Sequence, residues 1–520
     1  MANAILLVVL LSGQGPDPAR LARSAASVAE ADSVRPAAAR ALRDDLTRIL
    51  RDARLTGPGT GLLVVSLDQG DTLFAQNEAT PLTPASNLKL FTTAAALHYL
   101  GPSFRFNTYL LADGAVRDGV LEGDVVLYGT GDPTLSERFG SRALEEFADT
   151  LAALGIREIR GDVVGDASYF GGSGAGVGWN PDYSTATYAA PASALSFAEN
   201  IAMLELRPAP AGDRPTVRVV PGGGGIEVVN QLSTVAGGRS RVTLARSGFE
   251  GPLTVRGRVS SRSGTWRRWL PVSDPPSFAA GALREALETR GIAILGSVRA
   301  VHDSAESPVN GGSLFAPAAE PGSPVLQVLA VHTSPPLLEV LDVVNGKSHN
   351  FMAEQVLRTL GRMVAGDGSI EGGTAALNRF ARDVLGLSAN AFEAFDGSGL
   401  SPLNRVTAGA TVRLLSFAAG AVFWQSYLGT LPEAGSPTGL RRMYRTPAEG
   451  RLWAKTGTIR QVSALSGYVR SAGGEWLAFS ILNNETRSTG RAKAAEDRIG
   501  ARLAAFDRLA GEASAPPAGR

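Results

Sequence analysis

Apolar positions near the start of the chain change from helical to strand spacing. Between Ala37 and Leu55, leucine and isoleucine recur at intervals of three and four residues, which predicts an amphipathic helix. Gly57-Pro58-Gly59 ends this helix. Two short apolar runs follow, at 61–67 and 72–75, and the turn residues 68–71 between them predict a β-hairpin.

The C-terminal part predicts the same elements in reverse order. Apolar runs at 455–459, 464–469 and 476–482 are typical of strands, and 491–509 has the spacing of a helix. Two terminal helices would then flank an antiparallel sheet of about five strands. This pattern predicts an α+β domain whose two halves are far apart in the sequence.

The long middle of the chain is rich in predicted strands. Runs at 116–128, 159–164, 216–220 and 253–259 are separated by glycine and proline turns, and 279–290 has helical spacing. The middle therefore predicts additional β-rich structure, inserted between the two halves of the α+β domain.

The apolar stretch from Ser86 to Leu100 predicts another helix, and its first turn carries candidate chemistry. Lys89 is three residues after Ser86, so the two side chains share a helix face. At a helix start, backbone N–H groups are unpaired and the dipole favours negative charge. One turn would therefore supply a nucleophile, a base and an oxyanion donor. Because Ser-x-x-Lys is common by chance, a solvated surface pair is the alternative.

Two more motifs follow along the chain. Ser348-His349-Asn350 precedes an apolar helical stretch at 351–360, and Lys455-Thr456-Gly457 lies in a strand-like run at 451–459 that we expect at a sheet edge. Ser-x-x-Lys, Ser-x-Asn and Lys-Thr-Gly in this order resemble the signature of penicillin-binding proteins and class A β-lactamases. Three motifs on the expected elements argue against coincidence.

With these residues the chain resembles the low-molecular-mass class C penicillin-binding proteins of peptidase family S13, which are D-Ala-D-Ala carboxypeptidases and endopeptidases. The resemblance runs from Leu42 to Leu509 and includes the segments 82–90, 129–135, 190–196, 396–401 and 454–458. It implies an α+β fold with a serine β-lactamase/transpeptidase-like domain, split by a long β-rich insertion that forms one or two extra domains. The gap of about 260 residues between Ser86 and Ser348 matches such an insertion.

The expected division of the chain follows from this resemblance. The segments are 1–35 (signal peptide and leader), 36–103 with 308–512 (penicillin-binding, transpeptidase-like domain), 104–163 with 271–307 (inserted second domain), 164–270 (nested third domain) and 513–520 (tail).

Composition and charge narrow the classes of function. The chain has 520 residues and no cysteine, which excludes disulfides, thiolate metal sites and a cysteine nucleophile. A formal net charge of +1 gives no electrostatic reason to expect nucleic acid as a partner. The apolar run 4–11 is too short to span a bilayer and predicts a signal peptide, although the first basic residue is Arg20. We therefore expect an exported protein, periplasmic or extracytoplasmic at the cell wall, without an integral membrane span.

The resemblance implies a role for each motif residue. Ser86 would be the nucleophile, activated by Lys89 if burial and a nearby cation such as Lys455 keep its amine neutral. Ser348 would relay a proton to the departing D-alanine amine, and Asn350 would hold Lys89 and the substrate amide. Ser and Asn also favour helix N-caps, which is the alternative reading of this motif. The middle residue, His349, is expected to be exposed or to pack, with no part in proton transfer.

The third motif would recognise the end of the substrate. Lys455 would bind the terminal carboxylate, assisted by the hydroxyls of Thr456 and Thr458, while Gly457 lets a substrate backbone approach the strand. The oxyanion hole would be the backbone N–H of Ser86 together with that of Thr458.

One position departs from the family pattern. Many relatives carry arginine directly after the Asp-Gly-Ser-Gly-Leu-Ser run, where it grips the third residue of the substrate peptide together with an aspartate. Here that position is Pro402, which has no charge and no backbone donor, and Arg405 is three residues further on. Asp182 fills the aspartate position. We therefore expect weaker dependence on a diaminopimelate side chain, with ornithine- or lysine-like amines accepted through Asp182.

Several other readings fail or remain as alternatives. Gly346-Lys347-Ser348 imitates the end of a P-loop, but Leu341 stands where its first glycine is required. The four histidines are scattered and form no zinc motif, so neither metal nor cofactor is expected. A serine β-lactamase would need a Glu-x-x-Leu-Asn context, which is missing, and a non-catalytic wall-binding module is the other alternative. The expected partners are peptidoglycan stem peptides, with β-lactam antibiotics as covalent inhibitors.

Overall fold

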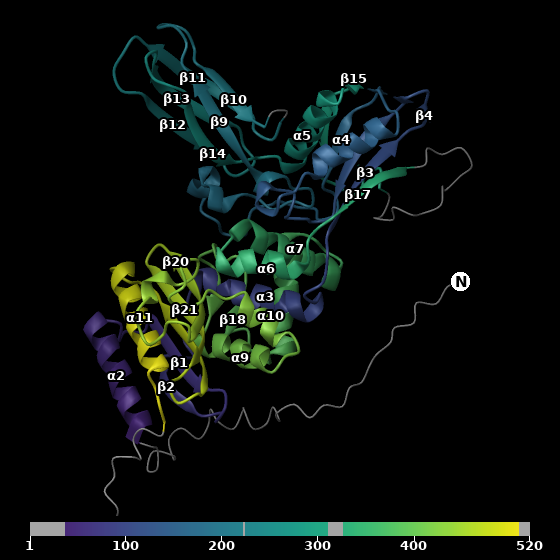
Figure 1. The fold of residues 1–520 in the computed structure, drawn as a ribbon. Helices are drawn as coiled ribbons and strands as arrows, with labels where there is room; N and C mark the ends of the chain where they lie inside the picture. The colour runs from purple at the N-terminus through teal and green to yellow at the C-terminus, as the bar shows by residue number, and fades with distance from the viewer. Residues whose placement is uncertain (1–36, 222–223, 310–325, 509–520) are drawn as a thin grey trace, which may run out of the picture.

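The computed structural model describes residues 37–221, 224–309 and 326–508. The predicted signal peptide (1–35) and tail (513–520) lie outside the described residues. In Figure 1 the two ends of the described chain meet in one lower body, and the middle of the chain forms an upper, inserted part.

The lower body is built on one antiparallel sheet, with the strand order β2-β1-β22-β21-β20. This confirms the expected five-stranded sheet made from both halves of the chain. Its strands are β1 (Thr60–Ser66), β2 (Thr72–Gln76), β20 (Leu452–Ile459), β21 (Val462–Arg470) and β22 (Trp476–Asn483). In β21 and β22 nearly every residue is buried, since helices cover both faces of the sheet. β20 is an edge strand, as expected for the Lys-Thr-Gly motif.

Two layers of helices enclose this sheet (Figure 1). One face is covered by the terminal helices α2 (Ala37–Ala53) and α11 (Thr489–Ala504), which share a core with the sheet around Leu46 and Ile499. The other face is covered by α3 (Leu88–Tyr99), α6 (Leu337–Gly346), α7 (Asn350–Ala365), α8 (Ile370–Arg379), α9 (Ala408–Ala419) and α10 (Trp424–Gly429). Every residue of α3 from Leu88 to Leu97 is buried, so it is a central helix rather than an amphipathic surface helix.

The inserted part begins with a five-stranded mixed sheet of order β16-β8-β6-β3-β17. Its elements are β3 (Asn107–Asp113), β6 (Asp124–Gly129), α4 (Ala143–Ala153), β8 (Val163–Asp166), α5 (Pro275–Thr289), β16 (Val298–Val301) and β17 (Gln327–Thr333). A smaller sheet lies beside it, made of β4 (Val116–Arg117), β5 (Val120–Leu121), β7 (Glu158–Ile159) and β15 (Ala293–Ile294). The helices α4 and α5 pack on the larger sheet around Leu127, Phe147 and Leu283.

A β-sandwich is nested within the insertion, at the upper left of Figure 1. It consists of β9 (Ile201–Arg207), β10 (Thr216–Val220), β11 (Val228–Val235), β12 (Arg241–Arg246), β13 (Leu253–Ser260) and β14 (Trp266–Pro271), in the sheets β10-β9-β14 and β11-β13-β12. The two sheets share an apolar core that includes Leu204, Val255 and Leu270.

Some expected element bounds in the insertion were wrong. The run 116–128 is divided into three strands, because Asp118 and Gly119 form a turn with positive φ angles of 50° and 81° and a bend at Glu122 and Gly123 separates β5 from β6. The run 159–164 is likewise interrupted, at Gly161. The helix expected at 279–290 begins earlier, at Pro275, since proline is well tolerated in a first helical turn. Two expected domain boundaries also differ from the sheets. The boundary between residues 163 and 164 falls inside β8. The boundary between residues 307 and 308 leaves β17 in the lower body, although β17 pairs with β3 of the insertion.

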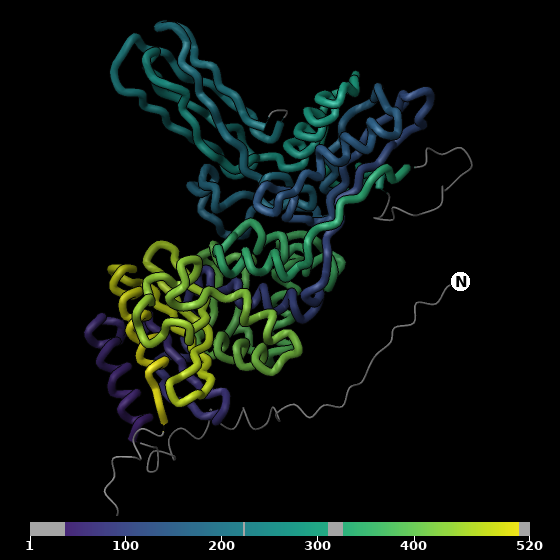
Figure 2. The backbone as a smooth tube through the Cα atoms, viewed as in Figure 1, coloured from purple at the N-terminus to yellow at the C-terminus, as the bar shows by residue number. Residues whose placement is uncertain are grey.

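The two crossings between the insertion and the lower body lie side by side, as Figure 2 shows. The backbone N–H of Phe106 donates to Ser334 Oγ at 2.9 Å, and the N–H of Ser334 donates to the carbonyl of Phe106 at 2.9 Å. The insertion therefore leaves just after α3 and returns just before α6 and α7. This closure brings the Ser348 motif beside the Ser86 motif although about 260 residues separate them.

Candidate active site

Ser86 lies in a tight turn between β20 and the loop 396–401. The turn Ala85–Asn87 is a 3-10 helix that continues directly into α3 at Leu88, so Ser86 lies in the first turn of the helix, as expected, although the α-helical part begins two residues later. A Cβ on Gly399 would lie 1.9 Å from the carbonyl oxygen of Ala85, and one on Gly457 would lie 2.8 Å from that of Pro84. Both glycines therefore allow backbone to pack directly against the serine turn. Glycine at position 457 is therefore needed for packing within the protein, in addition to the expected approach of a substrate backbone.

Lys89 is fully buried and uses its amine in three contacts. Nζ lies 3.1 Å from Ser86 Oγ, 2.7 Å from Asn350 Oδ1 and 2.6 Å from the carbonyl oxygen of Ser398. The last two partners are oxygens that only accept hydrogen bonds. A neutral amine has two hydrogens and one lone pair, so its hydrogens go to these oxygens and its lone pair faces the Ser86 hydroxyl. Neutral Lys89 is thus oriented to receive a proton from Ser86.

The burial of Lys89 also favours the neutral amine. Removal from water lowers the pKa of Lys89 to about 7, against the opposing effect of the carboxylates of Asp396 and Glu354. Burial, with the neighbouring Lys89, lowers the pKa of Lys455 well below its usual value. Burial is therefore the cause that lowers the pKa of Lys89, whereas the repulsion between the two lysines lowers the pKa of Lys455 and not, as expected, that of Lys89.

The Ser-x-Asn motif contacts both Lys89 and Lys455. Lys455 Nζ donates to Ser348 Oγ at 2.8 Å, which leaves the hydrogen of that hydroxyl free to be donated elsewhere. Asn350 contacts Lys89 through its oxygen, and its Nδ2 donates to the carbonyl of Tyr188 at 2.8 Å. The five motif residues thus form two contacting groups, Ser86–Lys89–Asn350 and Ser348–Lys455, which the backbone of the Ser-x-Asn motif joins.

The N-cap of α7 is His349, not Ser348 or Asn350. The His349 side chain accepts from the N–H of Met352, while Nε2 lies 3.0 Å from Glu199 Oε2. Its side chain is only 19% exposed. Of the two alternatives expected for His349, the side chain packs rather than being exposed, and its ring also contacts a carboxylate of the insertion, which the sequence did not predict.

The rest of the Lys-Thr-Gly strand forms the open edge of the site. Thr456 is half-buried and Thr458 exposed, and neither hydroxyl has a hydrogen-bond partner among the described residues. The strand is tied to the serine turn from within, since Asn87 Nδ2 donates to the carbonyl of Lys455 at 3.3 Å. Both threonines are thus available at an edge that ends beside Ser86.

Two buried carboxylates behind Lys89 were missed by the sequence analysis. Glu354, one helical turn after Asn350, accepts from the N–H groups of Gly397 and Ser398 at 2.9 and 2.8 Å. Burial, together with Asp396, raises the pKa of Glu354 to about 8. An acidic residue four positions after Asn350, inside an apolar helix, is the sequence signal that would have found it.

Asp396 holds the loop that supplies the carbonyl contact to Lys89. Its carboxylate accepts from the N–H groups of Gly399 at 2.8 Å and Ser401 at 2.6 Å, and from Trp179 Nε1 at 2.9 Å. Because Trp179 belongs to the insertion, this one buried side chain fixes both the loop and the segment that covers it.

That covering segment, 177–190, carries Asp182. Asp182 is exposed, with its backbone N–H bonded to Asn180 Oδ1 at 3.0 Å, and its carboxylate has no partner among the described residues. Pro402 is exposed as well. Arg405 does not replace the missing arginine, because its Nη1 is held by Thr83 Oγ1 and by the carbonyls of residues 402–404.

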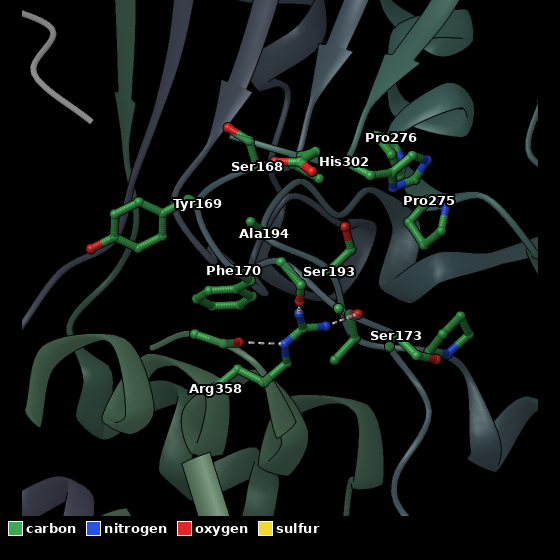
Figure 3. Close-up of a pocket in the computed structure, with 18 of the residues that line it drawn as sticks. Ser168, Tyr169, Phe170, Ser173, Ser193, Ala194, Pro275, Pro276, His302 and Arg358 are labelled. Carbon is green, nitrogen blue, oxygen red and sulfur yellow. Dashed lines mark hydrogen bonds between the residues drawn. The ribbon is translucent and has the colours of Figure 1, made fainter. Parts of the chain in front are cut away.

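A cavity of about 1080 Å³ lies at the junction of the insertion and the lower body (Figure 3). None of the five motif residues lines it. Arg358 points from α7 toward the insertion and is 2% exposed. Its guanidinium donates to the carbonyls of Gly368 at 2.8 Å, Ala192 at 2.7 Å and Gly171, and lies 4.9 Å from the centre of the Phe170 ring. This arginine connects the two parts of the chain, whereas the motif residue Asn350 lies at the first turn of α7.

The described residues contain no group of three or more His, Cys, Asp or Glu side chains that could hold a metal ion. No helix among them is both long enough and apolar enough to cross a membrane.

Comparison with known proteins gives consistent matches over most of the chain. The model of the D-Ala-D-Ala carboxypeptidase 3 (S13) family matches residues 42–506. The D-alanyl-D-alanine carboxypeptidase of Actinomadura sp. (strain R39) is 35% identical over 483 residues, 89% of this chain and 85% of that protein. The D-alanyl-D-alanine carboxypeptidase DacB of Haemophilus influenzae is 27% identical over 456 residues, 84% of this chain and 86% of that protein.

Solved structures agree on the fold. The crystal structure of penicillin-binding protein 4 (dacB) from Haemophilus influenzae superposes with a TM-score of 0.70 at 24% identity, covering 88% of this chain and 98% of that one. A second structure of that protein is a complex with a β-lactam. The extent of the family match and the 35% identity lead to one conclusion: the chain belongs to the D-Ala-D-Ala carboxypeptidase 3 (S13) family.

Proposed function

We propose that this protein is a serine D-Ala-D-Ala carboxypeptidase that acts through an acyl-enzyme on Ser86. The observation that carries the proposal is the orientation of Lys89: its two acceptor partners leave only the lone pair of a neutral amine for the Ser86 hydroxyl. Lys89 takes the hydroxyl proton while Ser86 Oγ attacks the carbonyl of the D-Ala-D-Ala amide. The backbone N–H groups of Ser86 and Thr458 receive the negative oxygen.

Breakdown of the tetrahedral intermediate needs a proton on the leaving nitrogen. The Ser348 hydroxyl, whose oxygen already accepts from Lys455, supplies this proton, so that D-alanine leaves as the C–N bond breaks. Ser348 regains the proton that Lys89 took from Ser86, and Lys89 is neutral again. Water then attacks the ester on Ser86 with Lys89 as the base, which releases the shortened peptide. Because the groups act as a unit, loss of one of them costs several orders of magnitude in rate.

Lys455, Thr456 and Thr458 bind the terminal carboxylate of the peptide at the open edge of β20. Penicillins carry a carboxylate and a strained amide in a similar arrangement, so they acylate Ser86 as covalent inhibitors. Cleavage of peptide cross-links that end in a D-amino acid uses the same steps, and we include this endopeptidase activity in the proposal. The substrate is the peptidoglycan stem peptide, which places the protein outside the cytoplasmic membrane.

Asp182 contributes selectivity at the third residue of the peptide. Its carboxylate is exposed and unpaired among the described residues, on a segment fixed over the site by Trp179 and Tyr188. With Pro402 uncharged and Arg405 bound to its own loop, this side of the site favours an amine end over a zwitterionic one.

The test is D-alanine release from a synthetic pentapeptide ending in D-Ala-D-Ala. The wild-type protein should release one D-alanine for each peptide cleaved, and stoichiometric benzylpenicillin should abolish the release. Ser86→Ala should be inactive with an unchanged melting temperature. Absence of release by the wild type would favour a non-catalytic wall-binding module, and rapid turnover of benzylpenicillin would favour a β-lactamase.

A further inference from the structure

A histidine connects the Ser-x-Asn turn to the inserted part of the chain. His349 Nδ1 accepts from the N–H of Met352 at the start of α7, so the ring proton is on Nε2, which donates to Glu199 Oε2 at 3.0 Å. Both side chains are largely buried, with 19% exposure for His349 and 9% for Glu199. Each ring nitrogen therefore has one partner, and the orientation of the ring is set from two sides.

Glu199 is itself held firmly by the insertion. Its carboxylate accepts from Arg138 Nε at 2.5 Å and Nη2 at 3.2 Å. Its backbone belongs to the turn 198–200, in which all three residues have positive φ angles of 48°, 56° and 54°. Non-glycine residues adopt this conformation only where surrounding contacts impose it. Asn200 provides such contacts, since its buried Nδ2 donates to the carbonyl of Pro191 and to Ser196 Oγ.

Ser348, the residue before His349, also has an unfavourable backbone conformation that surrounding contacts must hold. Ser348 has a positive φ of 57°, and this conformation directs its hydroxyl to Lys455. His349 follows it directly in the chain, so the position of its ring constrains the peptide group that joins the two residues. Among the described residues, Glu199 is the one side chain of the insertion that forms a hydrogen bond with Ser348 or His349.

We propose that Glu199 is a positioning residue for the reaction: through His349 it holds the turn in which the Ser348 hydroxyl faces the leaving group. This inference rests on the proposed function, because it assigns Glu199 to the step in which Ser348 protonates the departing nitrogen. An amide nitrogen must receive that proton as its C–N bond breaks. The leaving group of a thioester departs as a thiolate when the C–S bond breaks and needs no proton, so cleavage of a thioester does not depend on proton donation by Ser348.

Paired substrates separate this role from general damage to the site. We compare kcat/KM for a peptide ending in D-Ala-D-Ala with that for the same peptide in which a thioester replaces the scissile amide. Glu199→Ala should lower kcat/KM for the amide tenfold or more, mainly through kcat, and change it for the thioester less than twofold. Glu205→Ala is the matched control, since Glu205 is a similarly buried carboxylate of the insertion, paired with Arg267 at 2.6 Å.

A second variant removes the other partner of the contact between Glu199 and His349. His349→Asn keeps a good helix N-cap but cannot reach Glu199. It should reproduce the selective loss on the amide, and the double variant should lose no more than either single variant. Equal losses on both substrates, or additive effects in the double variant, would overturn the inference. If the wild type cleaves neither substrate, it is the proposed function that fails instead.

Discussion

The replacement Asn350→Asp tests the base assigned to Lys89. It changes one neutral oxygen, 2.7 Å from Lys89 Nζ, into a carboxylate oxygen of nearly the same shape. At an effective dielectric constant of about 20, unit charges at this distance attract by about 6 kcal/mol, an upper limit because the amide oxygen already contributes. We expect a third to a half of this energy to appear, which raises the pKa of Lys89 from about 7 to about 9.

The sign of the effect follows from the role of the amine. A raised pKa keeps Lys89 protonated, and therefore unable to accept the Ser86 proton, until the pH is higher. The assay is the second-order rate constant for acylation by benzylpenicillin between pH 5 and 9.5. The wild type should rise to a plateau with a midpoint near pH 7, and the variant should be about fiftyfold slower at pH 7 but only about twofold slower at pH 9.

A matched variant controls for the charge itself. Asn345→Asp also introduces a buried carboxylate, at the end of α6, where the present side chain contacts Thr430 rather than Lys89. It should leave the midpoint near pH 7. A midpoint that stays at pH 7 in Asn350→Asp, with a rate that is uniformly lower, would refute the assignment of Lys89 as the titrating base.

Three further predictions address other parts of the account. Lys455→Ala should lower acylation by both peptide and penicillin at least a hundredfold without unfolding the protein, and unchanged rates would remove Lys455 from the site. Arg358→Met should lower the free energy of unfolding by about 3 kcal/mol, because buried carbonyls lose their donor, while the acylation rate of the folded protein changes less than threefold. Matched pentapeptides should show less than a tenfold preference for diaminopimelate over ornithine at position three. A hundredfold preference, about 2.7 kcal/mol, would instead assign the role to another cation, and Arg460, which is exposed and directly follows β20, is the residue to replace first.

The lower body was largely predictable because its signals are local. The spacing in 37–55 and 491–509 specifies amphipathic helices, and the flanking strands alternate with clear turns, so both ends of the chain pointed to one sheet. Short strands in the insertion were harder, since β4 and β5 have only two residues each, too few to show an alternation of apolar and polar positions. The dipeptides Asp118-Gly119 and Glu122-Gly123 within 116–128 are the turn signals that separate them.

The site also contains residues that the sequence predicted and residues that it did not. Ser86, Lys89, Ser348, Asn350 and Lys455 are found from short motifs, because each motif is a few residues on one element. The contacts that tune them join separate elements: Glu354, on the same helix as Asn350, binds the loop 396–401, and Glu199 reaches His349 across 150 residues of sequence. The contact of Glu199 depends on how the insertion closes on the lower body, which residue spacing does not encode.

Intact-mass spectrometry after reaction with benzylpenicillin tests the central claim most directly. The account predicts one stable adduct per protein molecule, found by peptide mapping on the fragment that contains Ser86 and missing in Ser86→Ala. An adduct that persists in Ser86→Ala, or that maps to Ser348 or another residue, would contradict the assignment of Ser86 as the nucleophile.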